Sequence, residues 1–436
     1  MSNAIPARVA TEAIPEARAN PLGRRDFRLF WSGQAISSLG DQFALVALPW
    51  LALVLTGSAL ALGGVLALMA VPRATLMLVG GVLVDRLSPR RVMVLSNAVR
   101  LVTISALGVI VLAGDVALPM LYVFALVFGV ADAFFFPAQA AIVPALVEPD
   151  ELPAANAIAQ GTTQLTVFAG PAVAGLLIAA LGTTGSQLSL NGIGAALLID
   201  AFSFVVSLVT LGVIRAGSVG QSNPEPFITA LKAGLAFVWT WPSLRFVVLL
   251  AMGVNLLVVG PLYVGLPMIA YARLPEGAAA YGTLMSALGG GSLLGMIAVA
   301  ALPKPRPAIL GPFVLSILAI MGVGVAGLAL APSTLTACLV TAVVGFGMGY
   351  GNLTLITWAQ QRIPKALMGR VFSLILLGSV ALVPVSQVLA GALVQVSLSG
   401  MLAVAGIAMA ALTLTCATRP TVRDMGLEPM AAEAGA

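Results

Sequence analysis

The residues of this chain that could do chemistry are charged side chains placed inside long apolar stretches. An ionisable group at membrane depth is costly unless it is paired, hydrated or protonated, so each one is a candidate for function. The first half of the sequence holds all of them: Asp41, Arg73, Arg100, Asp132 and Asp200. Carboxylates facing guanidiniums can bind protons and switch partners, so this set predicts proton coupling rather than bond-making catalysis.

Counting along a helix at about 1.5 Å per residue places Asp41 and Arg73 at similar depth, and likewise Arg100 and Asp132. We therefore expect two intramembrane ion pairs, with Arg73 and Arg100 as the cationic partners. Three acids against two arginines leave Asp200 without an obvious partner. We expect Asp41 to be the proton-coupling acid, followed by Asp132 and then Asp200. The alternative is that the pairs are fixed structural clamps that never titrate.

Composition excludes most other chemistry. The 436 residues are 60% hydrophobic and 8% charged, with a mean hydropathy of +1.07, whereas soluble domains are about 45–50% apolar and about 25% charged. The chain has no histidine, and its two cysteines, Cys338 and Cys416, lie in apolar runs. Histidine metal sites, Ser-His nucleophiles and a disulfide framework are thereby excluded. No lysine lies in a phosphate-binding loop. We expect a non-enzyme with no metal, no cofactor and no nucleic-acid partner.

The elements that must position these charges are membrane helices, because about 20 apolar residues span a bilayer. Twelve stretches qualify, which predicts an all-α membrane protein. Lys and Arg gather before the first stretch, in alternate loops and after the last stretch. Positive charge marks the cytoplasmic side, so both termini are expected there. The stretches are residues 28–55, 59–83, 91–114, 119–142, 154–182, 191–214, 246–270, 279–301, 308–331, 334–358, 370–396 and 399–417.

A polar connection divides these stretches into six and six. Gly129 and Pro149 in the first half recur as Gly345 and Pro364 in the second, roughly 215 residues later. Such a spacing indicates a parallel duplication, as in transporters built from two bundles. The expected organisation is a cytoplasmic tail at 1–26, a six-helix bundle at 27–214, a cytoplasmic linker at 215–243, a second bundle at 244–418 and a cytoplasmic tail at 419–436.

Residues 81–91 read G-V-L-V-D-R-L-S-P-R-R, which puts an acid among arginines at a helix end. Such a loop can hold two helices together on one side of the membrane and release them when that side opens. It resembles the G-x-x-x-D-R-x-G-R-K-x loop of the major facilitator superfamily, although Ser88 and Pro89 depart from that pattern. The expected gate loop consists of Gly81, Asp85, Arg86 and Arg90, which match, and the adjacent Arg91.

The fifth stretch contains Gly170-Pro171 followed by Gly175, which is similar to the antiporter motif of the same superfamily; the alternative is an ordinary proline kink. Other strings resemble the drug:proton antiporter branch of macrolide-efflux and siderophore-export proteins. These strings are S-S-L-G-D-Q at 37–42, A-F-F-F-P-A-Q-A-A-I-V-P-A-L-V at 133–147, E-L-P-A-A-N at 151–156, I-D-A-F-S-F at 199–204 and G-R-V-F-S-L at 369–374.

A polar face on the first stretch must avoid lipid, because positions four residues apart superimpose on a helix. It carries Gln34, Ser38 and Gln42 beside Asp41. The resemblance implies two six-helix bundles in which helices 1, 4, 7 and 10 line a central cavity. It therefore adds further lining residues, which are Gln139, Asn255, Tyr350 and Asn352.

The expected function is secondary active efflux of a small amphipathic or hydrophobic compound, drug-, macrolide- or siderophore-like, in exchange for protons. The expected location is the plasma (inner) membrane, as a multi-pass monomer whose partners are the substrate, protons and the lipid bilayer. An uptake symporter or uniporter for a small metabolite is the first alternative. A membrane-embedded enzyme or lipid-handling scaffold is a more distant one, because no acidic metal cluster or sizeable soluble domain is evident.

Overall fold

The computed structural model describes residues 20–184, 187–188, 190–215, 235–364, 367–368, 371–372, 374–375, 378 and 381–427. The described chain is almost entirely helical, and eleven of its helical segments are long and apolar enough to cross a membrane. The predicted all-α membrane architecture is therefore confirmed in this coarser form.

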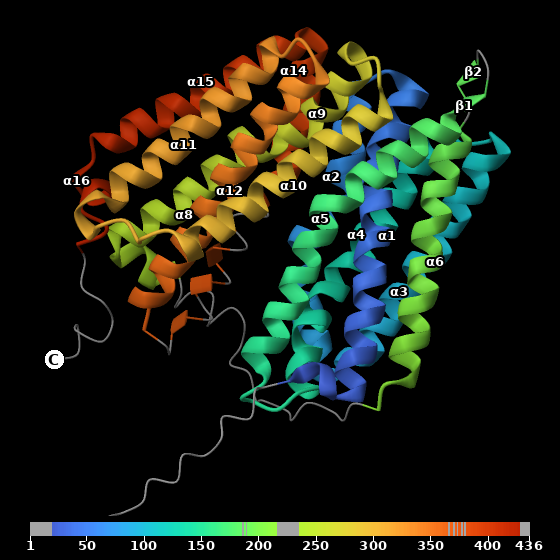
Figure 1. Ribbon diagram of the computed structural model, residues 1–436, viewed down its shortest axis with the longest axis horizontal. Helices are drawn as coiled ribbons and strands as arrows, with labels where there is room; N and C mark the ends of the chain where they lie inside the picture. The colour runs from blue at the N-terminus through green and yellow to red at the C-terminus, as the bar shows by residue number, and fades with distance from the viewer. Residues whose placement is uncertain are drawn as a thin grey trace, which may run out of the picture.

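The first half contains six long helices (Figure 1). The small β1–β2 hairpin is antiparallel and lies between α5 and α6. The helices and strands are α1 (Arg25–Thr56), α2 (Ala59–Arg86), α3 (Pro89–Ala113), α4 (Leu118–Ile142), α5 (Leu152–Gly182), β1 (Thr183–Thr184), β2 (Gln187–Leu188) and α6 (Asn191–Val213).

The second half begins with α8 (Pro242–Val254), a π-helical turn (Asn255–Val259) and α9 (Gly260–Arg273), which together form one continuous span where a single helix was expected at 246–270. Within the span expected at 370–396, the shorter apolar helix α14 (Val383–Val396) is formed. The remaining helices are α10 (Ala278–Ala301), α11 (Leu310–Gly327), α12 (Thr334–Arg362), α15 (Leu398–Ala417) and the short α16 (Pro420–Arg423).

Local sequence sets many of the helix ends. Ser58 and Ser88 accept hydrogen bonds from backbone N–H groups in the first turns of α2 and α3, which satisfies donors that have no partner within the helix. Gly57 and Gly114 end α1 and α3 in the left-handed region, with φ of 62° and 82°, where a side chain would be strained. These caps allow short connections between antiparallel neighbours.

Within each half, glycines let helices cross in direct backbone contact. Gly129 of α4 lies against the backbone of Met69 in α2, and Gly345 of α12 lies against that of Leu288 in α10. These crossings involve the second and fourth helices of one half and their counterparts in the other. In lipid the hydrophobic effect does not drive helices together. Small residues at such crossings therefore stabilise the association of helices through close van der Waals packing.

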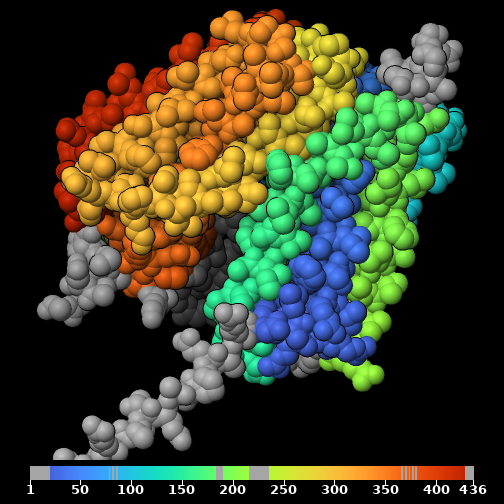
Figure 2. Space-filling view, viewed as in Figure 1, coloured from blue at the N-terminus to red at the C-terminus, as the bar shows by residue number. Residues whose placement is uncertain are grey.

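The two halves touch near one end of the molecule and separate toward the other (Figures 1 and 2). Gly175 of α5 packs against Gly282 of α10, and Gly63 of α2 packs against Gly391 of α14. Both contacts lie on the side that carries the β1–β2 hairpin, opposite the N-terminal end of α1. We call the α5–α10 and α2–α14 contacts the seam. In the part of the chain that the structure describes, the molecule is thus closed at the seam and open at the opposite end.

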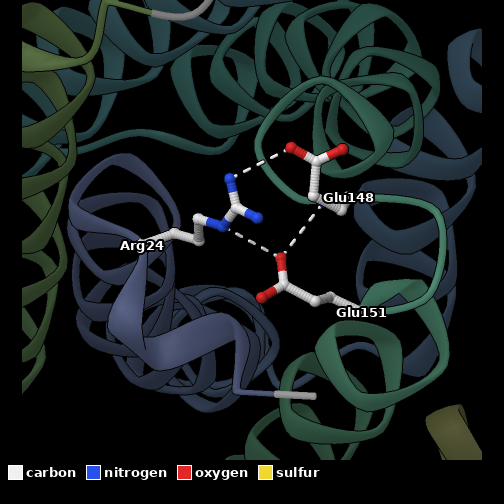
Figure 3. Close-up of polar contacts among 3 residues, drawn as sticks. All are labelled: Arg24, Glu148 and Glu151. Atoms are coloured by element: carbon white, nitrogen blue, oxygen red, sulfur yellow. Dashed lines mark hydrogen bonds and ion pairs between the residues drawn. The ribbon is translucent and has the colours of Figure 1, made fainter. Parts of the chain in front are cut away.

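At the open end, the start of α1 is fixed to the loop between α4 and α5. The Arg24 guanidinium lies between two carboxylates, at 3.1 Å from both Glu148 and Glu151, and Glu151 also accepts a hydrogen bond from the Glu148 backbone N–H (Figure 3). All three residues belong to the first half, so this cluster stabilises one bundle and does not bridge the two.

The residues that follow α15 dock onto the second half, which corrects the expectation of a tail from 419 onward. Trp358 Nε1 donates to the Met425 carbonyl and Arg362 donates to the Gly426 carbonyl, both at 3.0 Å. Met425 is fully buried, and the Val422 carbonyl lies directly against Gly311 of α11. We call residues 419–427 the strap. Its sequence looks polar by composition, but its apolar side chains fill a gap between helix ends.

The predicted linker also needs a correction at its end. Residues 216–234 lie outside the described residues, whereas 235–240 are helical. Within this segment Val238 is buried, and Trp241 packs its ring against Trp358 of α12 at 6.1 Å. The last part of 215–243 therefore belongs to the second bundle, because its aromatic and branched side chains have an apolar surface to cover.

Candidate functional site

A cavity of about 800 Å³ lies within the first half, toward the open end. It is lined from α1, α2, α3, α4 and α5 by both acidic and basic side chains, by amides and by aromatic rings. The charged residues in its lining are Asp41, Arg73, Arg100 and Asp132. Four of the five intramembrane charges thus share one cavity, and Asp200 is the exception.

Arg100 and Asp132 form the ion pair that depth counting predicts. The guanidinium is 98% buried and packs against aromatic rings, with centroids at 4.1 Å for Phe135 and 5.5 Å for Phe128. Rings facing a cation contribute about 0.5–2 kcal/mol, so Arg100 is held by charge and by π contacts together. The pair stands at the wall of the cavity, with Asp132 the more exposed partner.

The expected ion pair between Asp41 and Arg73 is not formed among the described residues. The Arg73 guanidinium instead lies over the Phe136 ring at 5.5 Å. Asp41 also lines the cavity and is within electrostatic reach of Arg100 and Asp132. Counting residues gives the height of a side chain in the membrane but not its direction around the helix axis, which explains the error.

Asp200 of α6 is fully buried behind α1 rather than exposed to the cavity. Its Oδ1 packs so closely against Gly40 that a β-carbon there would lie 2.8 Å away, and Ser203 Oγ donates to the same oxygen at 3.4 Å. Its Oδ2 has no hydrogen-bond partner among the residues described. Asp200 thus neighbours Asp41 across the α1–α6 interface, which the sequence alone did not predict.

A second cavity, of about 550 Å³, lies in the second half and is lined mainly by α8, α10, α11 and α12. Its side chains are apolar or neutral, including Met296, Met321 and Met348, and none of those given for its wall is ionisable. Gln160 of α5 lines both cavities, so the two adjoin at this residue. The charged cavity of the first half, the charged chamber, therefore adjoins the uncharged cavity of the second half, the uncharged chamber.

The predicted lining residues divide between these chambers. Tyr350 lines neither of them and needs a correction: it is 5% exposed and packs against Phe313 and Phe346 at 5.4 and 5.9 Å. The aromatic ring finds rings on α11 and on its own helix, one turn away, so it turns from the cavity. Gln34, Ser38, Gln42 and Gln139 line the charged chamber, and Asn255 and Asn352 line the uncharged one.

A polar stripe on α5 divides between the two chambers. Asn156, Gln160 and Thr163 face the charged chamber, while Gln164 faces the uncharged one. Nearby, Trp31 Nε1 donates to Thr162 Oγ1 at 2.9 Å and ties α1 to α5. The signal was the four-residue spacing of amides in an apolar helix, which marks a face that avoids lipid.

The gate loop is described only in part. The side chains of Gly81, Asp85 and Arg86 lie outside the described residues. Arg90 donates to the Leu211 and Gly212 carbonyls at 2.6 and 2.7 Å, so it caps the end of α6. A cation at a helix C-terminus is stabilised by the helix dipole. Arg91 is exposed and next to it in sequence.

The Gly-Pro motif of α5 lies at the seam. Gly170 packs on Gln42 of α1, whereas Pro171 and Gly175 face Gly282 of α10. One step further, the Ala172 backbone N–H donates to Ser286 Oγ of α10 at 2.8 Å. The motif therefore joins the two halves where they meet.

Aromatic side chains close the seam end. Trp50 of α1 stacks on Tyr281 of α10 with centroids 6.4 Å apart, and Tyr271 of α9 meets the same indole edge-on at 5.8 Å. Tyr281 also donates to the Leu45 carbonyl at 3.4 Å. Large rings from both halves therefore block passage from the chambers to this end.

Comparison with known proteins agrees with this architecture. Residues 17–433 match the family described as transmembrane secretion effector, within the major facilitator superfamily. The multidrug efflux pump Tap of Mycobacterium tuberculosis, like that of Mycobacterium bovis, is 26% identical over 288 residues. This match covers 63% of the chain and 64% of the length of Tap.

Solved transporter structures share the fold at low identity. A nucleoside transporter, NupG, superposes with a TM-score of 0.69 at 11% identity, over 90% of this chain and 99% of its own. A bacterial homologue of the iron transporter ferroportin, in an inward-facing state, gives 0.69 at 18% identity, over 91% and 99%. Because the family match spans nearly the whole chain, and its helices and cavities fit that fold, this multi-pass cell-membrane protein belongs to the transmembrane secretion effector family of major facilitator transporters.

Proposed function

We propose that this transporter exports a small amphipathic or hydrophobic compound in exchange for protons. The observation that carries the proposal is a charged chamber with Asp41 in its wall, free of an ion-pair partner among the described residues, and open to one side of the membrane. The similarity to the Tap efflux pump supports export as the direction.

The proposed topology has twelve membrane helices, both termini in the cytoplasm and bundles at 27–214 and 244–418. It rests on the clustering of arginines, among them Arg24 and Arg90, at the open end. In this orientation the protein is open to the cytoplasm and closed outside by the seam. Export then requires the seam to part while the cytoplasmic ends of the helices, including the gate loop, come together.

Asp41 is the proposed coupling acid. It lines the cavity without an ion-pair partner among the described residues, whereas Asp132 is already tied to Arg100 and Asp200 is buried behind α1. When the chamber is open, water can deliver or remove a proton at Asp41. When the bundles rearrange, Asp41 can approach Arg73, which here rests on an aromatic ring and is free to change partner. Asp132 and Asp200 follow as candidates in that order.

The test is uptake of a labelled amphipathic drug into inside-out vesicles, with and without a proton gradient in which the vesicle lumen is more acidic than the medium. We expect accumulation only with the gradient, and its collapse when a protonophore is added. Accumulation driven by the opposite gradient would support the uptake symporter instead. Equilibration that ignores the gradient would support a uniporter.

Replacing the coupling acid should separate exchange from accumulation. Asp41→Asn should abolish gradient-driven accumulation yet still allow exchange of labelled for unlabelled drug, because the chamber keeps its shape while the proton site is lost. Asp115→Asn is the matched control, since Asp115 is exposed in the α3–α4 loop. If Asp41→Asn keeps full proton-driven transport, Asp132 becomes the first candidate for the proton-coupling acid.

A further inference from the structure

The feature that identifies a ligand class is a row of three amides on α5. Asn156, Gln160 and Gln164 follow one another at four-residue spacing, which sets them about 6 Å apart along one helix face. None of the three makes a hydrogen bond to another described residue. Asn156 and Gln160 are exposed although they belong to a membrane helix, and both line the charged chamber.

This amide row connects the two chambers. Asn156 faces the charged chamber, Gln160 lines both and Gln164 faces the uncharged one. A ligand that occupies both chambers must therefore pass along three side chains that can each donate and accept hydrogen bonds. The uncharged chamber, at about 550 Å³, is large enough for the apolar body of a drug-sized molecule.

The charges around the row cancel. The lining of the charged chamber carries two aspartates and two arginines, namely Asp41, Asp132, Arg73 and Arg100. Two of these neutralise each other directly in the Arg100–Asp132 pair. The uncharged chamber adds no ionisable side chain among those described in its wall. A permanently charged ligand therefore gains no net attraction from the lining, and it would lose hydration on entering the apolar chamber.

We propose that the substrate is a neutral, oxygen-rich amphiphile whose apolar body fills the uncharged chamber while its hydroxyl, ether or carbonyl oxygens bind the amide row of α5. This inference rests on the proposed export function and specifies its substrate class. In this proposal α5 and the second half recognise the substrate, whereas the acids of the first half bind the proton. Gln160 and Gln164 are then the specificity-determining residues, since they face the chamber that holds the apolar body.

The test compares two fluorescent probes with the same apolar body, 2-naphthyl β-glucoside and a 2-naphthylmethyl trimethylammonium ion. Equilibrium dialysis against the full chain in lipid nanodiscs, with no proton gradient, gives the Kd of each. We expect the glucoside to bind at least tenfold more tightly. Gln160→Leu with Gln164→Leu should weaken glucoside binding about tenfold, since two hydrogen bonds are lost. The matched control is Gln361→Leu, an exposed glutamine of α12 outside both chambers.

A second variant keeps the test decisive if the double leucine variant folds poorly. Gln160→Glu preserves side-chain size and adds one negative charge, so it should shift the preference toward the ammonium probe. Tighter binding of the ammonium ion by the unaltered protein, absent glucoside binding, or an unchanged preference in both Gln160 variants would overturn the inference. Because binding is measured without a gradient, these outcomes are separate from failure of proton-driven export.

Discussion

At the level of single residues, the charged side chains of the cavity have two kinds of surroundings. Arg100 and Asp132 form a direct ion pair, and the Arg100 guanidinium also packs against three aromatic rings, including Phe204 at 5.7 Å. Arg73 has one aromatic contact and borders open cavity. The Arg100–Asp132 pair is thus held in place, whereas the Arg73 side chain has space in which to change its position.

Removing Arg100 should destabilise the protein because Asp132 would keep a charge without its partner. Breaking a buried pair costs about 3–5 kcal/mol, whereas replacing both partners by apolar groups is often neutral. We expect Arg100→Met to lower the thermal unfolding temperature in detergent strongly, and Arg100→Met with Asp132→Leu to recover most of the loss. Equal destabilisation by both would mean that the aromatic contacts of Arg100, not the ion pair, hold this region.

The sequence predicts these residues better than it predicts their partners. Charges in apolar stretches single out residues that lipid does not tolerate, and four of the five line one cavity, while their expected part in proton coupling stays a prediction. Depth along the helix predicts the Arg100–Asp132 pair. The rotation of each helix depends on how it packs, and that packing turned Arg73 toward Phe136 and Tyr350 toward Phe313. No local pattern contains this information.

At the level of helices, glycines decide which surfaces touch. The Gly-Pro motif of α5 was open to two interpretations, an antiporter signal or a kink, and its position at the seam shows that it forms a contact between bundles. The partner glycine, Gly282 of α10, carries no signal in the sequence. Its importance follows from tertiary packing, where a residue without a side chain lets two helices meet.

Adding a methyl group at the seam should disfavour the closed state of that end. A β-carbon on Gly282 would lie 2.8 Å from the Gly175 α-carbon, so α5 and α10 must move apart. We expect Gly282→Ala to reduce transport at least fivefold with normal membrane insertion. Gly161→Ala is the control, since nothing lies within 4 Å of a β-carbon there. If the two variants transport equally well in vesicles, the packing at the seam does not affect the transport cycle.

The strap should stabilise the second bundle. Its removal exposes the Trp358 ring and leaves the indole N–H and the Arg362 guanidinium without the carbonyls they bind. A chain ending at Thr418 should unfold at a clearly lower temperature than the full chain, by fluorescence-detected melting. A chain ending at Leu427 keeps the strap and should match the full chain. Identical melting of both truncations would show that the strap contributes little.

At the scale of the whole molecule, counting along the sequence predicts two equivalent bundles. Six and six apolar stretches and the repeat of Gly129 as Gly345 indicate the duplication, and both glycines make equivalent helix crossings. The state in which the molecule rests could not be predicted. It depends on the balance between contacts at the seam and contacts at the opposite end, and the sequence contains the residues for both.

The direction of opening is testable by labelling. In a background with Cys338→Ser and Cys416→Ser, a cysteine replacing Asn156 should react with a membrane-impermeant maleimide in inside-out vesicles only, because the proposed topology opens the charged chamber toward the cytoplasm. A cysteine replacing Glu276, exposed in the α9–α10 loop, should react in right-side-out vesicles only. The reverse labelling pattern would show that the membrane orientation is opposite to the proposed one.

The confinement of intramembrane charge to the first half has an electrical consequence. If a neutral cargo leaves in exchange for protons, the fixed charges of the lining return to their starting positions after each cycle, and only the protons carry net positive charge into the cell. Transport is then electrogenic, and the membrane voltage contributes about 2.3 kcal/mol per 100 mV for each proton carried. A cell whose internal and external pH are equal could still expel the compound, with its resting voltage as the only source of work.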